Sequence, residues 1–108
     1  MKYKRIGLDN KAAWNTLVKT VPHSYAHCWD YNYAISLSLG QHIHLHVFES
    51  NEGIIFIPLA ERKKEEEYPE LVSPYGFSGF AGNAHALSSS NAINALYEVL
   101  RENHYVTL

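Results

Sequence analysis

Residues 42–59, with the sequence HIHLHVFESNEGIIFIPL, decide the fold of this chain. The first part alternates between two side-chain types, which predicts a β-strand with His42, His44 and His46 on one face and aliphatic side chains on the other. A turn at 50–53 leads into an uninterrupted apolar run, which predicts a second strand paired with the first as a hairpin. Because such a run is typical of a strand buried on both faces, we expect this hairpin at the centre of a helix-covered sheet.

Two helices are expected ahead of this hairpin. A weak alternation over 3–8 predicts a first strand, and the pair Asp9-Asn10 can cap a following helix by accepting hydrogen bonds from its free backbone amides. Spacings of three and four residues gather one buried face on that helix, formed by Ala13, Trp14, Leu17 and Val18. A second helix is predicted over 24–39, with Gly40 as its stop signal.

The rest of the chain predicts one more helix and the remaining strands. A charged connection over 61–67 precedes a short strand at 70–73 and a glycine-containing loop at 74–83. A third helix is expected from about residue 88 to residue 103, and 105–108 begins a last strand. The predicted order is β-α-α-β-β-β-α-β, an α/β (α+β) fold with a mostly antiparallel central sheet flanked by helices.

Length and composition predict a single domain over 1–108. The chain has 108 residues, 46% of them hydrophobic and 19% charged, with a formal net charge of -2, as in ordinary globular proteins. The 9 basic residues against 11 acidic ones give no strong positive field, so stable nucleic-acid binding is not expected. No apolar run approaches the length of a transmembrane segment, no secretion signal is recognisable, and Cys28 alone excludes an internal disulfide. We therefore expect a cytoplasmic location.

Two groups of residues offer chemistry by themselves. His42, His44 and His46 supply imidazoles on one strand face, but neighbours about 7 Å apart along one strand do not converge on a single tetrahedral ion. We therefore expect a polar or helix-covered face, partly protonated near about pH 6.5, with a metal site as the alternative. Cys28 beside His27 allows a nucleophile and base, yet adjacent helix positions point about 100° apart, which favours a packed cysteine.

Two local signatures resemble those of the GNAT-like acyltransferase fold. They are residues 57–62, IPLAER, and residues 73–79, SPYGFSG. Together with the order of elements, they are similar to the first GNAT-like half of the Fem-type peptidoglycan-bridge aminoacyltransferases and their polysaccharide-biosynthesis relatives. In those relatives a strand ending in Pro-Leu, with an Arg nearby, is followed by a Ser-Pro-Tyr-Gly-Tyr-x-Gly loop. Phe77 replaces the second Tyr here, and the resemblance spans nearly the whole chain.

The resemblance implies substrate binding in acyl or aminoacyl transfer for cell-envelope or polysaccharide assembly. Carried over to the matching positions, the substrate-binding residues are Ser73, Tyr75, Gly76, Gly79 and Arg62. The Tyr75 phenol can hydrogen-bond a substrate or donate a proton, or else anchor the loop by packing. Arg62 can bind a carboxylate or phosphate through two hydrogen bonds, or pair with the acidic residues at 65–67. We assign no catalytic residue and no metal ligand.

The chain departs from the family in its length and in its donor signature. Relatives of this kind carry a second GNAT-like half downstream, where the acyl-donor site is expected, so we do not expect this chain to transfer an acyl group alone. Segment 77–83 lacks the Arg or Gln that opens the pyrophosphate signature of acetyl-CoA users. A structural turn is expected there, with phosphate binding as the alternative.

These departures determine the expected ligands and partners. We assign no cofactor, although the resemblance implies acyl-CoA or aminoacyl-tRNA as the donor. The expected substrate is a small molecule or cell-envelope precursor, and the expected protein partner is a second copy of the chain or a missing second half-domain. The competing hypothesis is a non-catalytic binding or dimerisation module. Acyl-CoA binding separates the two hypotheses, because the module predicts none.

Overall fold

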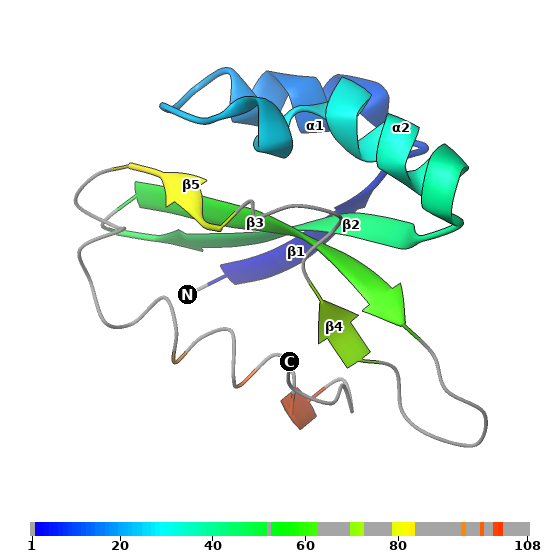
Figure 1. The fold of residues 1–108 in the computed structure, drawn as a ribbon. Coiled ribbons are helices and arrows are strands. Elements are labelled where there is room, and N and C mark those ends of the chain that lie inside the picture. Colours follow the sequence, from blue (N-terminus) through cyan, green and yellow to red (C-terminus); the bar gives the residue numbers. More distant parts are fainter. Residues whose placement is uncertain are drawn as a thin grey trace.

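The chain adopts an α+β fold in a computed structural model that describes residues 2–51, 53–62, 70–72, 79–83, 94, 98 and 101–102. An antiparallel sheet has the strand order β1-β2-β3-β4, and β5 also pairs with β3. Helices α1 and α2 lie together on one side of this sheet (Figure 1). In chain order the elements are β1 (Lys2–Gly7), α1 (Lys11–Val18), the 3-10 turn η1 (Tyr25–His27), α2 (Trp29–Leu39), β2 (His42–Ser50), β3 (Gly53–Arg62), β4 (Glu70–Val72) and β5 (Ala81–Gly82).

The predicted hairpin is confirmed and forms the middle of the sheet. Its register runs from His42 opposite Glu61 to Ser50 opposite Gly53. Strand β3 borders β2 along one edge and both β4 and β5 along the other. Four side chains from the two faces of β3 are 2% exposed or less, namely Ile55, Phe56, Leu59 and Ala60. The uninterrupted apolar run of β3 thus reflects burial on both faces, as its sequence predicts.

The core lies between the sheet and the two helices. The aliphatic face of β2 packs there with side chains from α1, β1 and β3, and the buried cluster consists of Ile6, Trp14, Val18, Val21, Ile43, Leu45, Val47, Phe56, Ala60 and Ala81. Trp14 of α1 is 0% exposed, and its Nε1 donates a hydrogen bond to the His27 carbonyl at 2.9 Å. Trp14 therefore joins α1 to η1 while it fills the core.

The two predicted cap residues lie where expected, Asn10 at the start of α1 and Gly40 at the end of α2. The Asn10 side chain accepts a hydrogen bond from the Ala13 backbone N–H at 3.3 Å, which satisfies one free amide at the start of α1. Gly40 follows α2 with a φ of 64°, the left-handed conformation that glycine adopts without a steric penalty. These local signals explain why α1 begins and α2 ends where they do.

The single helix predicted over 24–39 is wrong at its start. The chain forms η1, leaves the helical conformation at Cys28 (φ -74°, ψ 150°) and only then begins α2. The Ser24 and His27 side chains form a capping box around η1, and Asn32 Nδ2 donates to the Ala26 carbonyl at 2.9 Å. These polar side chains satisfy backbone groups that a continuous helix would pair internally, so they stabilise the break.

The later elements are described only in part. Strand β4 agrees with the strand predicted at 70–73, and the described positions of the third predicted helix, residues 94, 98 and 101–102, are helical. The strand predicted at 105–108 lies outside the described residues. In the part of the chain that is described, no helix is both long and apolar enough to cross a membrane.

Candidate functional site

The edge of β3 away from β2 is divided between two short strands. Strand β4 pairs with the end of β3, from Ala60 to Arg62, and β5 pairs with Ile55 and Phe56. Figure 1 shows these two strands near opposite ends of β3. Between them, residues 57–59 pair with neither strand, and we call this stretch the β3 interval. Pro58 at its middle has no backbone N–H and needs no partner strand there.

The predicted substrate loop begins and ends at the two sides of this interval. The chain passes from Val72 of β4 to Ala81 of β5 through residues 73–80, which contain the Ser-Pro-Tyr-Gly motif. Both ends of the loop are fixed to β3, one on each side of the β3 interval. The candidate site therefore consists of the β3 interval, the loop ends and the residues that hold those ends.

His27 holds the C-terminal end of the loop. The Ser24 backbone N–H, which can only donate, lies 3.0 Å from His27 Nδ1, so Nδ1 is an acceptor. The proton of this neutral imidazole is therefore on Nε2, which donates to the Gly79 carbonyl at 3.0 Å. The ring also meets Phe56 edge to face, with centroids 5.9 Å apart. His27 thus connects η1, β3 and the loop in one defined tautomer.

Asn83 holds the same loop end from the other side. Its Oδ1 accepts from the Ile54 N–H at 2.7 Å, and its backbone N–H donates to the Ile54 carbonyl at 3.0 Å. Gly82 has a φ of 153°, and a Cβ there would collide with the Ile54 carbonyl and with Ile55. Only glycine lets the backbone approach β3 this closely. The loop end is therefore fixed on β3 by paired hydrogen bonds and close backbone contact.

The structure describes the predicted site residues unequally. Gly79 lies beside His27, as described above, with a φ of 67° that favours glycine. Arg62 is the last residue of β3, and its backbone pairs with that of Glu70 in β4. The side-chain contacts of Arg62 lie outside the described part of the chain, as do Ser73, Tyr75 and Gly76. Their assignment to substrate binding stays a prediction.

We expect His27→Leu to release the loop end, whereas His27→Gln, which keeps a donor near the Nε2 position, should hold it better. The leucine variant leaves the Gly79 carbonyl and the Ser24 N–H without their partner, at a cost below the about 1–3 kcal/mol of a fully buried group, because both hydrogen bonds are only partly buried. Amide hydrogen exchange of a peptide covering 79–83 measures the release. His23→Leu is the matched control, because His23 Nδ1 contacts only the nearby Val21 carbonyl at 2.8 Å among the described contacts. Equal exchange in all three variants would contradict this role of His27.

Cys28 is a packed cysteine rather than half of a nucleophile pair. Its thiol lies 3.7 Å from the Ser24 carbonyl, to which it donates. Both nitrogens of the neighbouring His27 are engaged, one with Ser24 and one with Gly79. His27 therefore has no free lone pair with which to deprotonate the thiol, and the expectation of a packed cysteine agrees with the geometry.

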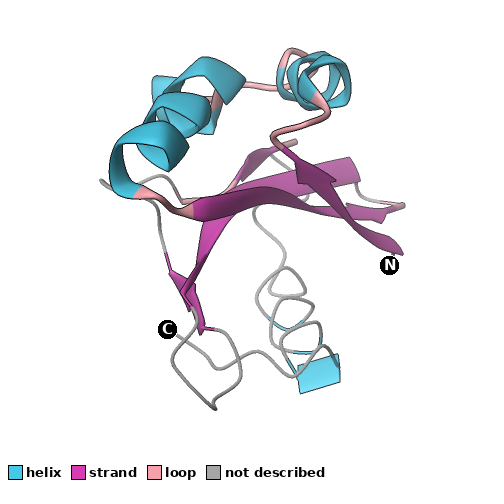
Figure 2. Cartoon of the chain, turned by 90° about the vertical axis from the view of Figure 1, so that its right-hand side faces the viewer, coloured by secondary structure: helices cyan, strands magenta, loops and turns pink. Residues whose placement is uncertain are grey.

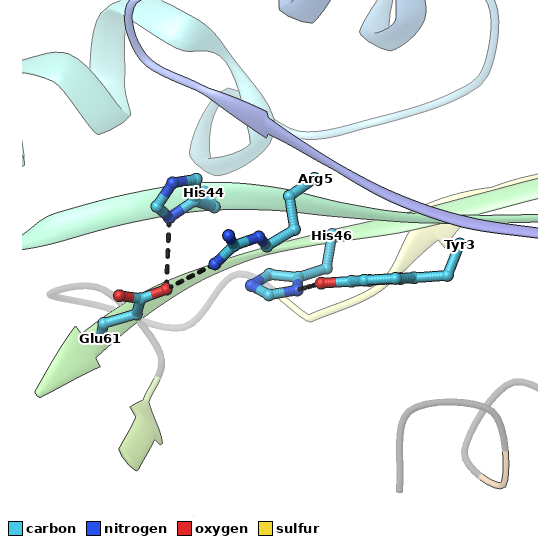
Figure 3. Close-up of polar contacts among 5 residues, drawn as sticks. All are labelled: Tyr3, Arg5, His44, His46 and Glu61. Atoms are coloured by element: carbon cyan, nitrogen blue, oxygen red, sulfur yellow. Dashed lines mark hydrogen bonds and ion pairs between the residues drawn. The ribbon is translucent and has the colours of Figure 1, made fainter. Parts of the chain in front are cut away.

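A second polar cluster lies on the sheet face opposite the helices (Figure 3). Tyr3 Oη and His46 Nδ1 are hydrogen-bonded at 2.7 Å, and the two rings stack with centroids 5.8 Å apart. Arg5 donates to Glu61 Oε1 at 3.0 Å, and His44 Nδ1 lies 3.5 Å from the same oxygen. Strands β1, β2 and β3 all contribute to the cluster, which joins side chains far apart in the sequence.

Burial keeps the histidines of this cluster neutral. His46 is 0% exposed, and burial lowers its pKa to about 3, with smaller contributions from His44 and Arg5. Burial also lowers the pKa of His44, against the opposing effect of Glu61. The expected partial protonation near pH 6.5 is therefore wrong for His46, because this strand face changes from exposed at His42 to fully buried at His46. A base this weak does not accept protons at neutral pH, so we assign the cluster no proton-transfer role.

The metal alternative for the three histidines gains no support from the side-chain geometry. Among the described residues, no group of three or more His, Cys, Asp or Glu side chains is arranged to hold a metal ion. His46 Nδ1 is hydrogen-bonded to Tyr3, and His42 lies at the exposed end of β2. The covered strand face is observed at His46, which is fully buried.

Sequence reasoning missed His27 and Asn83 as residues that hold the loop. A signal was present for His27, because Ser24 and His27 have the three-residue spacing of a capping box, with His in place of the usual Glu or Gln. Asn83 gave no comparable signal, since its partner Ile54 lies 29 residues earlier. The Tyr3 and Glu61 contacts with the histidine face likewise join distant strands.

Comparisons with known proteins assign no function to this geometry. No family model, curated protein or solved structure matches the chain. The resemblance to the GNAT-like acyltransferases therefore rests on the motifs and on the order of elements.

Proposed function

We propose that this chain is a GNAT-like domain related to the first half of the Fem-type aminoacyltransferases, and that it binds the acceptor substrate for acyl or aminoacyl transfer in cell-envelope or polysaccharide assembly. The observation that supports this most is the division of the β3 edge between β4 and β5. The loop with the family's Ser-Pro-Tyr-Gly motif starts and ends on either side of the β3 interval. This arrangement fits a loop that holds a ligand against a strand edge.

The chemistry of the β3 interval favours an acceptor that contains amide groups. Neither β4 nor β5 pairs with residues 57–59, and the alternation of the strand turns only the Pro58 carbonyl toward this edge, where it can accept a hydrogen bond from an amide N–H of an extended ligand. The peptide stem of a cell-envelope precursor has such groups and also carries the amine that receives the acyl group. Substrate positioning of this kind lowers the barrier of a two-substrate transfer.

Acceptor binding fits this chain better than donor binding. Segment 77–83 contains no Arg or Gln in register with the pyrophosphate signature of acetyl-CoA users. The end of that segment is fixed to β3 through Asn83 and Gly82 rather than opening a helix at that point. Under the proposal, acyl-CoA or aminoacyl-tRNA binds to a second half-domain, and this chain does not transfer the acyl group alone.

A thermal-shift titration tests the assignment. We expect a soluble, nucleotide-linked muramyl pentapeptide to raise the melting temperature saturably, because a ligand that binds only the folded state stabilises it. Acetyl-CoA should give no shift at the same concentrations. Stabilisation by acetyl-CoA alone would contradict acceptor binding and indicate a donor site. The His27→Leu variant, compared with His23→Leu, tests whether the precursor signal depends on the loop.

A non-catalytic binding module is the second candidate, favoured by apolar side chains exposed on η1 and α2. Tyr25 is 72% exposed, Leu37 68% and Leu39 53%. Exposed apolar side chains of this size are typical of interaction surfaces when they are contiguous. This candidate predicts a folded chain that binds neither the precursor nor acyl-CoA in the titration above.

A further inference from the structure

Strand β1 is an outer strand of the sheet. Among the described strands only β2 pairs with it, in an antiparallel register from Lys2 opposite Glu49 to Gly7 opposite His44. Figure 2 shows the strand that begins at the marked N-terminus along one margin of the sheet, below a helix. An outer strand presents backbone N–H and C=O groups to which an extended peptide can add.

A groove lies beside this edge, between β1 and α1. It has a volume of about 390 Å³ and is lined by Lys4 and Ile6 from β1 and by Ala13, Thr16 and Leu17 from α1. A strand added to β1 at the usual spacing of about 4.8 Å directs alternate side chains to the helix side of the sheet, into this groove. The small side chains of α1 leave room there for an apolar side chain opposite Ile6.

The charges along the β1 edge favour an acidic peptide. Lys2 and Lys4 are alternate positions of the strand on the face that carries Ile6, and both are exposed. The Lys4 ammonium lies 3.5 Å from Glu49, but the two side chains are 56% and 45% exposed, so this pair contributes little and a peptide carboxylate can compete for Lys4. A second hollow lies beside Lys2, lined by Glu49, Ser50 and Asn51.

The same charges disfavour a second copy of the chain as the added strand. A symmetric antiparallel β1–β1 pair centred on Lys4 places Lys4 of one copy opposite Lys4 of the other, on the same face of the sheet. Like charges opposite one another on neighbouring strands are destabilising. The occupant that fits this edge is therefore a different, negatively charged strand.

We propose that the β1 edge binds an extended acidic peptide as an additional antiparallel strand. In this complex an apolar side chain enters the groove opposite Ile6, and carboxylates lie opposite Lys4 and Lys2. Every described pair of strands in the sheet is antiparallel, so the added strand continues the existing pattern. This surface is separate from the β3 interval, and the proposal does not depend on acceptor binding there.

Fluorescence anisotropy with a labelled peptide, acetyl-Thr-Val-Glu-Glu-Thr-Glu-amide, tests the proposal at low ionic strength. We expect saturable binding to the wild-type chain that weakens about tenfold or more in Lys4→Glu, because the charge reversal acts at the contact. Lys19→Glu is the matched control, since Lys19 lies at the end of α1, outside the groove, and the change in net charge is the same. Thr16→Phe, at an exposed helix position, fills the groove and should also weaken binding.

Two N-methylated peptides distinguish strand addition from simple charge attraction. Methyl groups on one set of alternate amides block the hydrogen bonds to β1, whereas methyl groups on the other set point to solvent. We expect one methylated peptide to lose binding and the other to keep it. No binding by the wild-type chain, equal behaviour of the two methylated peptides, or equal weakening by Lys4→Glu and Lys19→Glu would each overturn the proposal.

Discussion

The His46→Gln variant is expected to lose much of the acid sensitivity of the wild-type chain. His46 is fully buried with a pKa of about 3, against about 6.5 in an unfolded chain. Between these values the unfolded state binds a proton that the folded state does not. The free energy of unfolding of the wild-type chain therefore falls as the pH is lowered from about 6.5 toward 3, by about 1.4 kcal/mol for each pH unit from this residue. Above about pH 6.5 the contribution is complete and the slope disappears.

Urea denaturation at several pH values between 7.5 and 4 gives the free energy of unfolding as a function of pH. The effect is measured as the difference between variant and wild type in the slope of that dependence. Glutamine at position 46 costs stability at every pH, so the slope and not the absolute stability is the relevant quantity. His42→Gln is the matched control, because His42 is the exposed histidine on the same strand face. Parallel pH profiles for the wild type and His46→Gln would show that His46 titrates normally in the folded chain.

The Trp14→Ala variant should lose about 3–5 kcal/mol of unfolding free energy, the typical cost of removing a fully buried large aromatic side chain. Trp14 is 0% exposed within the core cluster, and its Nε1 hydrogen bond to the His27 carbonyl joins α1 to the segment that holds the loop. Thermal or urea denaturation measures the loss. Trp14→Phe keeps most of the apolar volume and should lose less, chiefly through the missing hydrogen bond.

Trp29→Ala provides a matched comparison for Trp14→Ala. Trp29 also donates from Nε1, to the Leu8 carbonyl at 2.8 Å, but it is only partly buried and stacks on Tyr33 at the surface of α2. Its replacement should therefore cost less than that of Trp14. If the Trp29 variant were the less stable of the two, the core would not be centred on Trp14.

Much of the fold follows from local sequence patterns. The alternation and apolar runs of β2 and β3 identify the central hairpin, because side-chain period and burial are properties of each strand. Asn10 and Gly40 identify helix ends through the backbone groups they satisfy or relieve. The break at Cys28 was not predicted, because it depends on His27 and Asn32 side chains that replace helical hydrogen bonds.

Fewer contacts of the candidate site than of the fold could be predicted from the sequence. The Ser-Pro-Tyr-Gly motif identifies the loop, but the residue that holds its end is His27, 52 positions before Gly79. Contacts of this length depend on how η1 packs on β3, which no local pattern encodes. His46 presents the same difficulty, since its neutral state depends on burial and on strands β1 and β3.

Hydrogen exchange with and without the soluble muramyl pentapeptide tests acceptor binding at the β3 interval most directly. We predict new protection at the amides of residues 79–83, which end the loop, and no change at a distant strand end such as Ser50. This protection should be lost in His27→Leu and retained in His23→Leu. Exchange that the precursor leaves unchanged across the loop end of the folded chain would contradict the proposed function.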